Sequence, residues 1–213
     1  MMKVLSVNVS KPRAIQVGGR EVMTGIYKEP VQGRVRVRRH NLDGDAQADL
    51  RVHGGEYKAV YAYPFEHYAA WERELGRGDL TPGMFGENLT VTGATEDIVY
   101  IGDTLRIGTA VLQVTQPRTP CFKLARKFGR PQLIQEFLAS GRSGYYLRVV
   151  EEGELAAGDV IEFVHRDPQR VTVRGLLGIT DLKEINPDLA ARAFRVEALP
   201  PNWREDVAAL LDN

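Results

Sequence analysis

A lone thiol beside two cations is the most chemically distinctive feature of the sequence. Cys121 is the only cysteine, it directly follows Pro120, and Arg118 and Lys123 flank it. A proline at this point predicts the first turn of a helix, and both a helix N-terminus and nearby cations favour thiolate over thiol. Cys121 is therefore a candidate metal ligand or nucleophile. The alternative is a small buried hydrophobic residue, and the residues alone leave both open.

A second polar cluster extends from Asp45 to Lys58 and contains the pair Gly54-Gly55. Paired glycines let backbone N–H groups approach a ligand closely and cradle an anion. His53 and Lys58 add a hydrogen-bond donor and a point charge, so the segment favours an oxyanion or phosphate site. A simple turn between strands is the alternative.

A third candidate pair, Glu87 and Asn88, follows a glycine-containing loop and precedes a strand-like segment. Polar side chains at the mouth of a strand can contact a ligand, although a turn with a left-handed Asn explains the pair equally well. His40, His67 and His165 have no metal-ligand spacing with one another. We expect His67 to be solvated on the polar side of its helix.

The composition excludes several classes of protein. One cysteine in 213 residues cannot form an internal disulfide, and it cannot supply the several thiolates of a zinc–thiolate site or an iron–sulfur cluster. Lys and Arg number 28 and Asp and Glu 28, which argues against a general nucleic-acid or anionic-membrane binder. No apolar stretch approaches the roughly 18 residues of a spanning helix. We expect a cytoplasmic protein in a reducing compartment.

Alternating strands with frequent turns are expected to position these residues. Period-two segments occur at 3–9, 33–37, 104–107 and 110–115, and segments 145–150 and 159–164 resemble a closing hairpin. Many short strands predict a mainly β fold with helices, in which the sheet closes into a barrel. Helices are expected from Pro64 to Leu75 and from Pro120 to Gly141, the second broken at 129–131.

The C-terminal tail changes from strand alternation to helix-capping patterns. Starts resembling capping boxes occur at Asp181 and Asn202, and Asn186-Pro187 fits an N-cap followed by proline at the first helical position. The sequence therefore predicts a barrel domain over 1–165 and a three-helix appendage over 166–213.

Three of these segments together resemble the MOSC domain family, which is named for the C-terminal domain of molybdenum-cofactor sulfurase. They are 49–64, which contains His53-Gly-Gly and Lys58, then Phe85-Gly-Glu-Asn-Leu89, and Pro117-Arg-x-Pro-Cys121-x-Lys-Leu124. Their order and spacing agree with the family. The resemblance covers nearly the whole chain and is greatest to the YiiM-like bacterial branch, which has a C-terminal three-helix domain.

The resemblance implies a β-barrel that binds the molybdenum–pterin cofactor, with Cys121 as the protein ligand to the metal. The activity it implies is reductive removal of oxygen from N-hydroxylated compounds, namely hydroxylamino purines, hydroxylamines and amidoximes. Within the matched motifs, His53 is the first candidate proton donor and Glu87 the second. The other positions matched to cofactor binding are Gly54, Gly55, Lys58, Asn88, Arg118 and Lys123.

The chain has no flavin or nicotinamide fingerprint, so we expect an external, flavin-type reductase to supply electrons. Two alternatives stay open. One is a non-enzymatic cofactor or sulfur carrier that uses Cys121, and the other is a hydrolase in which Cys121 pairs with His53. The sequence is compatible with a homodimer but does not determine the oligomeric state.

Overall fold

The computed structural model describes residues 1–46 and 55–211. Two of the predicted site residues, His53 and Gly54, lie outside these ranges, as does Asp49.

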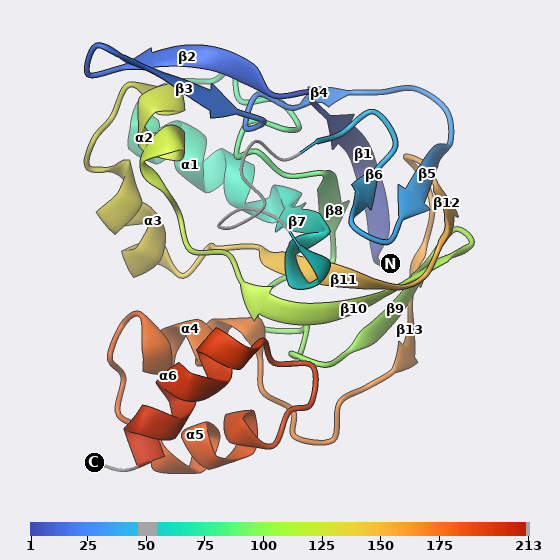
Figure 1. Ribbon diagram of the computed structural model, residues 1–213, viewed down its shortest axis with the longest axis vertical. Coiled ribbons are helices and arrows are strands. Elements are labelled where there is room, and N and C mark those ends of the chain that lie inside the picture. The colour runs from blue at the N-terminus through green and yellow to red at the C-terminus, as the bar shows by residue number, and fades with distance from the viewer. Residues whose placement is uncertain (47–54, 212–213) are drawn as a thin grey trace.

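A large, mostly antiparallel sheet forms the centre of the fold (Figure 1). Its strands are β1 (Lys3–Val9), β4 (Glu29–Pro30), β7 (Val60–Pro64), β8 (Leu89–Thr92), β9 (Thr104–Ile107), β10 (Ala110–Pro117), β11 (Tyr145–Glu151) and β13 (Ile161–His165). They are ordered β13-β9-β10-β11-β7-β8-β1-β4, and β7 and β8 pair in parallel. Two smaller sheets consist of β12 (Gly153–Leu155), β5 (Val35–Arg38) and β6 (Asn41–Leu42), and of the hairpin β2 (Arg13–Val17) and β3 (Arg20–Thr24).

The predicted mixture of mainly strands with helices is confirmed, but closure into a barrel is not. The order of the main sheet ends at β13 on one side and β4 on the other. An isolated bridge between Lys3 and Val160 brings β1 next to the start of β13 without forming a strand pair there. Backbone hydrogen bonds from Val4 N to Asp159 O, from Gly158 N to Val4 O and from Ile161 N to Met2 O also join the two edges, so the sheet curves towards closure.

The predicted closing hairpin is wrong. β11 pairs with β10 and β7, whereas β13 pairs with β9 through partners such as Ile161 and Ile107. The two strands are near each other in sequence, but β12 and the turn after it intervene. Hydrophobic alternation identifies a strand without identifying its neighbour, which explains the error.

Three helices pack against one side of the sheet around an aromatic core. They are α1 (Tyr68–Leu75), which follows the 3-10 turn η2 (Phe65–His67), α2 (Phe122–Phe128) and α3 (Leu133–Ser140). Each ends at a glycine in the left-handed conformation, with φ of 65°, 64° and 66° respectively, a conformation that glycine adopts without a Cβ penalty. Trp71 and Phe137 stack within this core at 5.7 Å between ring centroids.

The chain ends in three helices, which lie on the opposite side of β10 from the β2–β3 hairpin (Figure 1). They are α4 (Val173–Thr180), α5 (Pro187–Phe194) and α6 (Pro201–Leu211). The predicted Asn186 cap is confirmed, because its side chain accepts from Leu189 N. The predicted helix start at Asp181 is wrong: Thr172 caps α4, and Asp181 follows the end of that helix.

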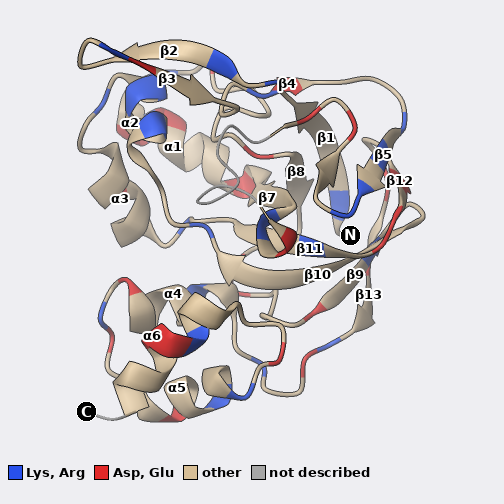
Figure 2. Ribbon diagram, viewed as in Figure 1, with Lys and Arg blue, Asp and Glu red and all other residues tan. Residues whose placement is uncertain are grey.

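The helices α4–α6 share one hydrophobic core with the sheet. Leu176, Trp203 and Val207 belong to the same buried cluster as Leu112 and Val114 of β10. The predicted domain boundary at residue 165 therefore does not coincide with a gap in the hydrophobic core, and the two-domain division stays a prediction. Both signs of charge are spread over all parts of the fold (Figure 2), and no described helix is long and apolar enough to cross a bilayer.

Candidate functional site

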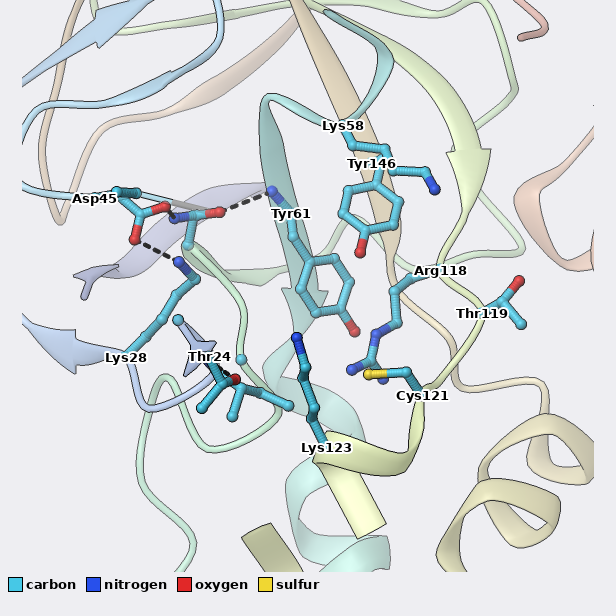
Figure 3. A pocket seen from close by; sticks show the side chains of 15 residues that line it. Thr24, Lys28, Asp45, Lys58, Tyr61, Arg118, Thr119, Cys121, Lys123 and Tyr146 are labelled. Atoms are coloured by element: carbon cyan, nitrogen blue, oxygen red, sulfur yellow. Dashed lines mark hydrogen bonds and ion pairs between the residues drawn. The ribbon is translucent and has the colours of Figure 1, made fainter. Parts of the chain in front are cut away.

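A pocket lies where the end of β10, the start of α2 and the segment after β3 meet (Figure 3). Its empty volume is about 670 Å³, including space open to solvent. The residues that line it are Thr24, Gly25, Ile26, Lys28, Asp45, Ala46, Lys58, Tyr61, Gly86, Asn88, Arg118, Thr119, Cys121, Lys123 and Tyr146. We call this the main pocket. Five predicted site residues are among them: Lys58, Asn88, Arg118, Cys121 and Lys123.

Arg118 presents a buried positive charge to the main pocket. Its residue exposure is only 5%, and its guanidinium lies over the rings of Tyr61 and Phe137 at 5.2 and 5.1 Å from their centroids. These aromatic faces hold the cation by attraction to their π systems. Nη1 has no hydrogen-bond partner among the described residues. A buried, unsatisfied N–H group of a cation is strongly suited to an anionic ligand.

Cys121 lies beside this guanidinium, and its sulfur is drawn next to Arg118 in Figure 3. The residue stands at the N-cap position of α2, directly before the first turn, its side chain makes no capping hydrogen bond, and it is partly exposed. Burial opposes the charge of Arg118, but its interactions with Tyr61, Tyr146 and Cys121 together raise the pKa of Arg118. Positive charge close to sulfur stabilises the thiolate, the form that binds metals.

Two of the three lysines that line the pocket lie near Arg118 and Tyr146. The amino group of Lys123 points towards the centre of the pocket, and Lys58 lies beside Tyr146 with Nζ 5.9 Å from the ring centroid (Figure 3). Burial lowers the pKa of Lys58. Lys123 is 8% exposed. The pocket therefore concentrates cations in a chain whose overall formal charge is zero.

A hydrogen-bonded chain forms the opposite wall of the pocket. Lys28 Nζ lies 2.5 Å from Asp45 Oδ1, and Asp45 Oδ2 accepts from Asn88 Nδ2 at 2.9 Å. Asn88 Oδ1 accepts from the backbone N–H of Tyr61, and Asn88 Nδ2 also donates to Asn8 O. Asn88 lines the pocket as predicted, but its amide is engaged in holding these segments together.

Glu87 is placed differently from the prediction. It does not line the main pocket, and it is fully buried. Its carboxylate accepts from Tyr68 Oη, from Gly83 N at 2.8 Å, from Phe85 N at 3.0 Å and from Thr90 Oγ1 at 2.8 Å. These contacts make Glu87 the anchor of the loop before β8. A carboxylate surrounded in this way is not positioned to deliver protons to the pocket.

The glycine-rich motif is only partly described. Gly55 has a φ of 86° and precedes the 3-10 turn η1 (Glu56–Lys58), but it does not line the pocket. His53 and Gly54 lie outside the described residues. The expectation for His67 is wrong: its Nε2 lies 2.7 Å from Glu96 Oε2, and its side chain is 16% exposed. Within residues 1–46 and 55–211, no three His, Cys, Asp or Glu side chains are grouped to hold a metal ion.

A second pocket adjoins the first on the side of the C-terminal helices. Lys58, Thr119, Cys121 and Tyr146 line both pockets. The remaining lining residues of this second pocket are Gln116, Pro117, Pro120, Asp181, Asn202, Trp203 and Asp206. Cys121 therefore lies at the boundary between two adjoining spaces.

Several residues that line the two pockets were not predicted from the sequence. Lys28 belongs to no motif, and it reaches the site only because β1 pairs with β4 directly after it. Tyr61 and Tyr146 resemble ordinary strand residues, and β7 and β11 place them side by side. Gln116 lines the second pocket. Its position directly before Pro117, the first residue of the motif Pro117-Arg-x-Pro-Cys121, was the feature of the sequence that could have indicated it.

Comparison with known proteins identifies the family of the chain. The MOSC domain model matches residues 49–162, which is more than half of the chain and includes Lys58, Arg118, Cys121 and Lys123.

The chain belongs to the MOSC domain family.

Relatives and solved structures agree with this assignment. This MOSC chain is 43% identical to YflK of Bacillus subtilis (strain 168) over 94% of its own length and 90% of that protein. It is 36% identical to YiiM of Escherichia coli (strain K12) over 84% and 81%. The crystal structure of YiiM from Geobacillus stearothermophilus is 36% identical and superposes with a TM-score of 0.83, covering 99% of this chain and 100% of that one.

A third relative is longer. It is called "Reductase", comes from Gibberella moniliformis (strain M3125 / FGSC 7600), and is 32% identical over 91% of this chain, which corresponds to 35% of that protein.

Proposed function

We propose that this MOSC protein is a molybdenum-cofactor-dependent reductase that removes oxygen from N-hydroxylated compounds such as hydroxylamino purines, hydroxylamines and amidoximes. One observation carries the proposal: Cys121 lies beside a buried guanidinium whose Nη1 has no partner among the described residues, in a pocket also lined by Lys28, Lys58 and Lys123. The fungal relative named "Reductase" supports the reaction class.

The lining fits the cofactor chemically. Cys121 offers one soft thiolate, which suits a metal that already carries the sulfur ligands of its pterin. Arg118, Lys58 and Lys123 offer hydrogen-bond donors and positive charge for the phosphate of the same group. One thiolate together with several cations suits a metal that is already bound to an anionic organic cofactor.

The bound cofactor would supply two-electron oxygen-atom transfer from the N–OH group. The net reaction converts R–NH–OH, two electrons and two protons into R–NH₂ and water. An external, flavin-type reductase is the proposed electron donor, and we place the reaction in the cytoplasm because the single cysteine must remain reduced. We keep His53 as the proposed proton donor, whereas the position of Glu87 argues against that role.

The chain's own residues would bind and orient the reactants. Arg118 is held between two rings, so its N–H groups keep a fixed direction towards an anion. The network of Lys28, Asp45 and Asn88 fixes the opposite wall. Burial of Lys123 and partial burial of Lys58 reduce competition from water and strengthen the attraction of both for negative charge.

A second candidate function is a carrier of the cofactor or of sulfur. The partial exposure of Cys121 favours this function, because a carrier must transfer the bound cofactor or sulfur to an acceptor.

Elemental analysis and turnover distinguish the two functions. The protein is expressed in a host that makes the cofactor. Cys121→Ala is the test variant, and Gln113→Met, at a β10 residue that lines neither pocket, is the control. The reductase proposal predicts about one molybdenum per chain and reductant-driven conversion of 6-hydroxylaminopurine to adenine. Cys121→Ala should lose both, and Gln113→Met should keep both. Metal without turnover would favour the cofactor carrier, and protein without metal would contradict the reductase and the cofactor carrier.

A further inference from the structure

Two residues directly before β11, Ser143 and Gly144, hold the buried cation of the main pocket from two directions. The backbone N–H of Arg118 donates to Gly144 O at 3.3 Å, and Tyr61 Oη donates to Ser143 O at 2.8 Å. The guanidinium of Arg118 in turn lies over the ring of Tyr61 (Figure 3). Segment 143–144 therefore fixes both the backbone of Arg118 and the ring against which its charge is held.

Segment 143–144 packs closely against β7, the strand that carries Tyr61. Ser143 is fully buried. Gly144 has a φ of 63°, and a Cβ at this position would lie 2.4 Å from Ala62 O. Glycine is required here both by the left-handed backbone and by the lack of space. The segment therefore has little freedom to move without displacing β7.

The carboxylate of Glu96 holds this segment from outside the main pocket. Glu96 is 2% exposed, and its Oε1 accepts from the backbone N–H of Gly144 at 2.6 Å. Its Oε2 lies 2.7 Å from His67 Nε2, which donates because an ionised carboxylate only accepts. Hydrogen bonds to an ionised group are stronger than neutral ones. With one donor on each oxygen, the carboxylate is held in a single orientation.

The backbone that carries Glu96 is also anchored. Arg174 N, in the first turn of α4, donates to Glu96 O at 3.1 Å, and Tyr145 Oη donates to Ala94 O at 3.1 Å. Glu96 therefore reaches Gly144 from a backbone that a C-terminal helix and β11 both hold.

The charge of Glu96 and its hydrogen bond to Gly144 should affect the main pocket in opposite directions. Glu96 and His67 line neither pocket, so they act on a bound ligand only from a distance or through other residues. Through space, a negative charge at Glu96 opposes the binding of an anion. Through Gly144, it favours binding by holding Arg118 in place. The sign of the effect therefore distinguishes the two.

The geometry points to Glu96 as a positioning residue of the main pocket: its hydrogen bond to Gly144 holds segment 143–144 so that Tyr61 and Arg118 present the guanidinium to an anionic ligand. This inference rests on the proposed function only in taking Arg118 as an anion-binding residue. It gives the pair of Glu96 and His67 a part in ligand binding although neither residue touches the ligand.

The test compares two conservative variants of the full chain, purified from a host that does not make the cofactor. Glu96→Asp keeps the charge but shortens the side chain, so the bond to Gly144 N should be lost and the affinity for inorganic phosphate should fall by about fivefold. Glu96→Gln loses the charge but keeps an oxygen that can accept from Gly144 N, so phosphate should bind as tightly as in the wild type, or more tightly. Calorimetric titration at one pH, below the melting temperature of every variant, measures both.

A matched control comes from another carboxylate that accepts from the backbone. Glu66 is exposed and accepts from Gly93 N and Thr92 Oγ1. Glu66→Asp shortens the side chain by the same methylene, and phosphate affinity should stay at the wild-type value.

A double-mutant cycle tests the route through segment 143–144. Tyr61→Phe keeps the ring under Arg118 but removes the hydrogen bond to Ser143 O. If Glu96 acts through the same segment, Glu96→Asp should weaken phosphate binding less in the Tyr61→Phe background than in the wild type. The same fold-change in both backgrounds would contradict this route.

The remaining outcomes separate this inference from the proposed function. Loss of affinity in Glu96→Gln with wild-type affinity in Glu96→Asp would assign the effect to charge and overturn the positioning role. Equal affinities in all variants, or a wild type that binds no phosphate, would overturn it even if the protein holds molybdenum and turns over. The predicted pattern in a protein that never acquires molybdenum would support the positioning role and count against the reductase.

Discussion

At the scale of single residues, the site depends on charge placed next to one sulfur atom. Arg118 is buried between two rings beside Cys121, and Lys58 and Lys123 line the same pocket. The sequence indicated these residues because they lie within a few positions of the cysteine or of the Gly-Gly pair. It did not indicate Lys28, Tyr61 or Tyr146, because strand pairing brings them to the pocket from distant segments. It also assigned Glu87 to the site, whereas backbone N–H groups and hydroxyls surround that carboxylate.

Loss of the positive charge of Lys123 should weaken anion binding. Lys123→Met removes a buried cation that lines the main pocket, so the affinity for inorganic phosphate should fall by about tenfold. Arg126 lies exposed on the same helix. Arg126→Met removes one positive charge away from the pocket and is the matched control. Calorimetric titration of both variants checks the prediction, which fails if the two lose affinity equally.

Anion binding should also depend on pH through the buried lysines. Burial lowers the pKa of Lys28, although Asp45 and Glu87 partly oppose this effect, and burial lowers the pKa of Lys58. Each amino group therefore loses its charge below the ordinary lysine value of 10.5, and the affinity falls as pH rises through this range. Sulfate is the appropriate probe because its own charge stays constant. Lys58→Met should bind sulfate more weakly and show a smaller decline with pH, and a wild-type affinity independent of pH up to 10 would contradict the account.

At the scale of elements, local sequence patterns predicted where helices end, whereas they did not predict which strands pair. Glycine after a helical pattern correctly predicted the ends of α1, α2 and α3, because the left-handed cap is a local property. The cap of α4 was missed because Thr172 is followed three residues later by Gly175 rather than by an acid. The pairing of β13 with β9 could not be predicted from alternation, which carries no information on which strand lies alongside.

Glu87 should behave as the anchor of the loop before β8. Glu87→Gln replaces one acceptor oxygen by a donor that faces other donors, so the free energy of unfolding should decrease by about 1–3 kcal/mol. Urea denaturation measures this loss. The pH dependence of turnover should keep its shape in the variant. Unchanged stability together with an altered pH profile would instead support a role in proton delivery.

At the scale of the whole molecule, the C-terminal helices share a buried hydrophobic cluster with the sheet. Leu176 of α4 is fully buried in a cluster that includes Val114 of β10. The second pocket lies at this junction and is lined from both sides. The prediction of an appended three-helix piece captured its helical content, whereas the shared core arises from packing between segments about 60 residues apart.

The shared core predicts a single unfolding transition. Leu176→Ala should destabilise the protein by about 2–5 kcal/mol and lower its melting temperature without splitting the transition. Differential scanning calorimetry provides the measurement. Two separate heat-absorption peaks, with only one shifted by the substitution, would show that residues 166–213 fold independently.

The most direct test of the central claim is X-ray absorption spectroscopy at the molybdenum edge, on protein from a cofactor-competent host. If Cys121 is the protein ligand, molybdenum in the wild-type protein should have one more sulfur neighbour than molybdenum in Cys121→Ser, whether that variant retains a full or a reduced amount of metal. The same sulfur count in both proteins, or no molybdenum in the wild type, would contradict the account.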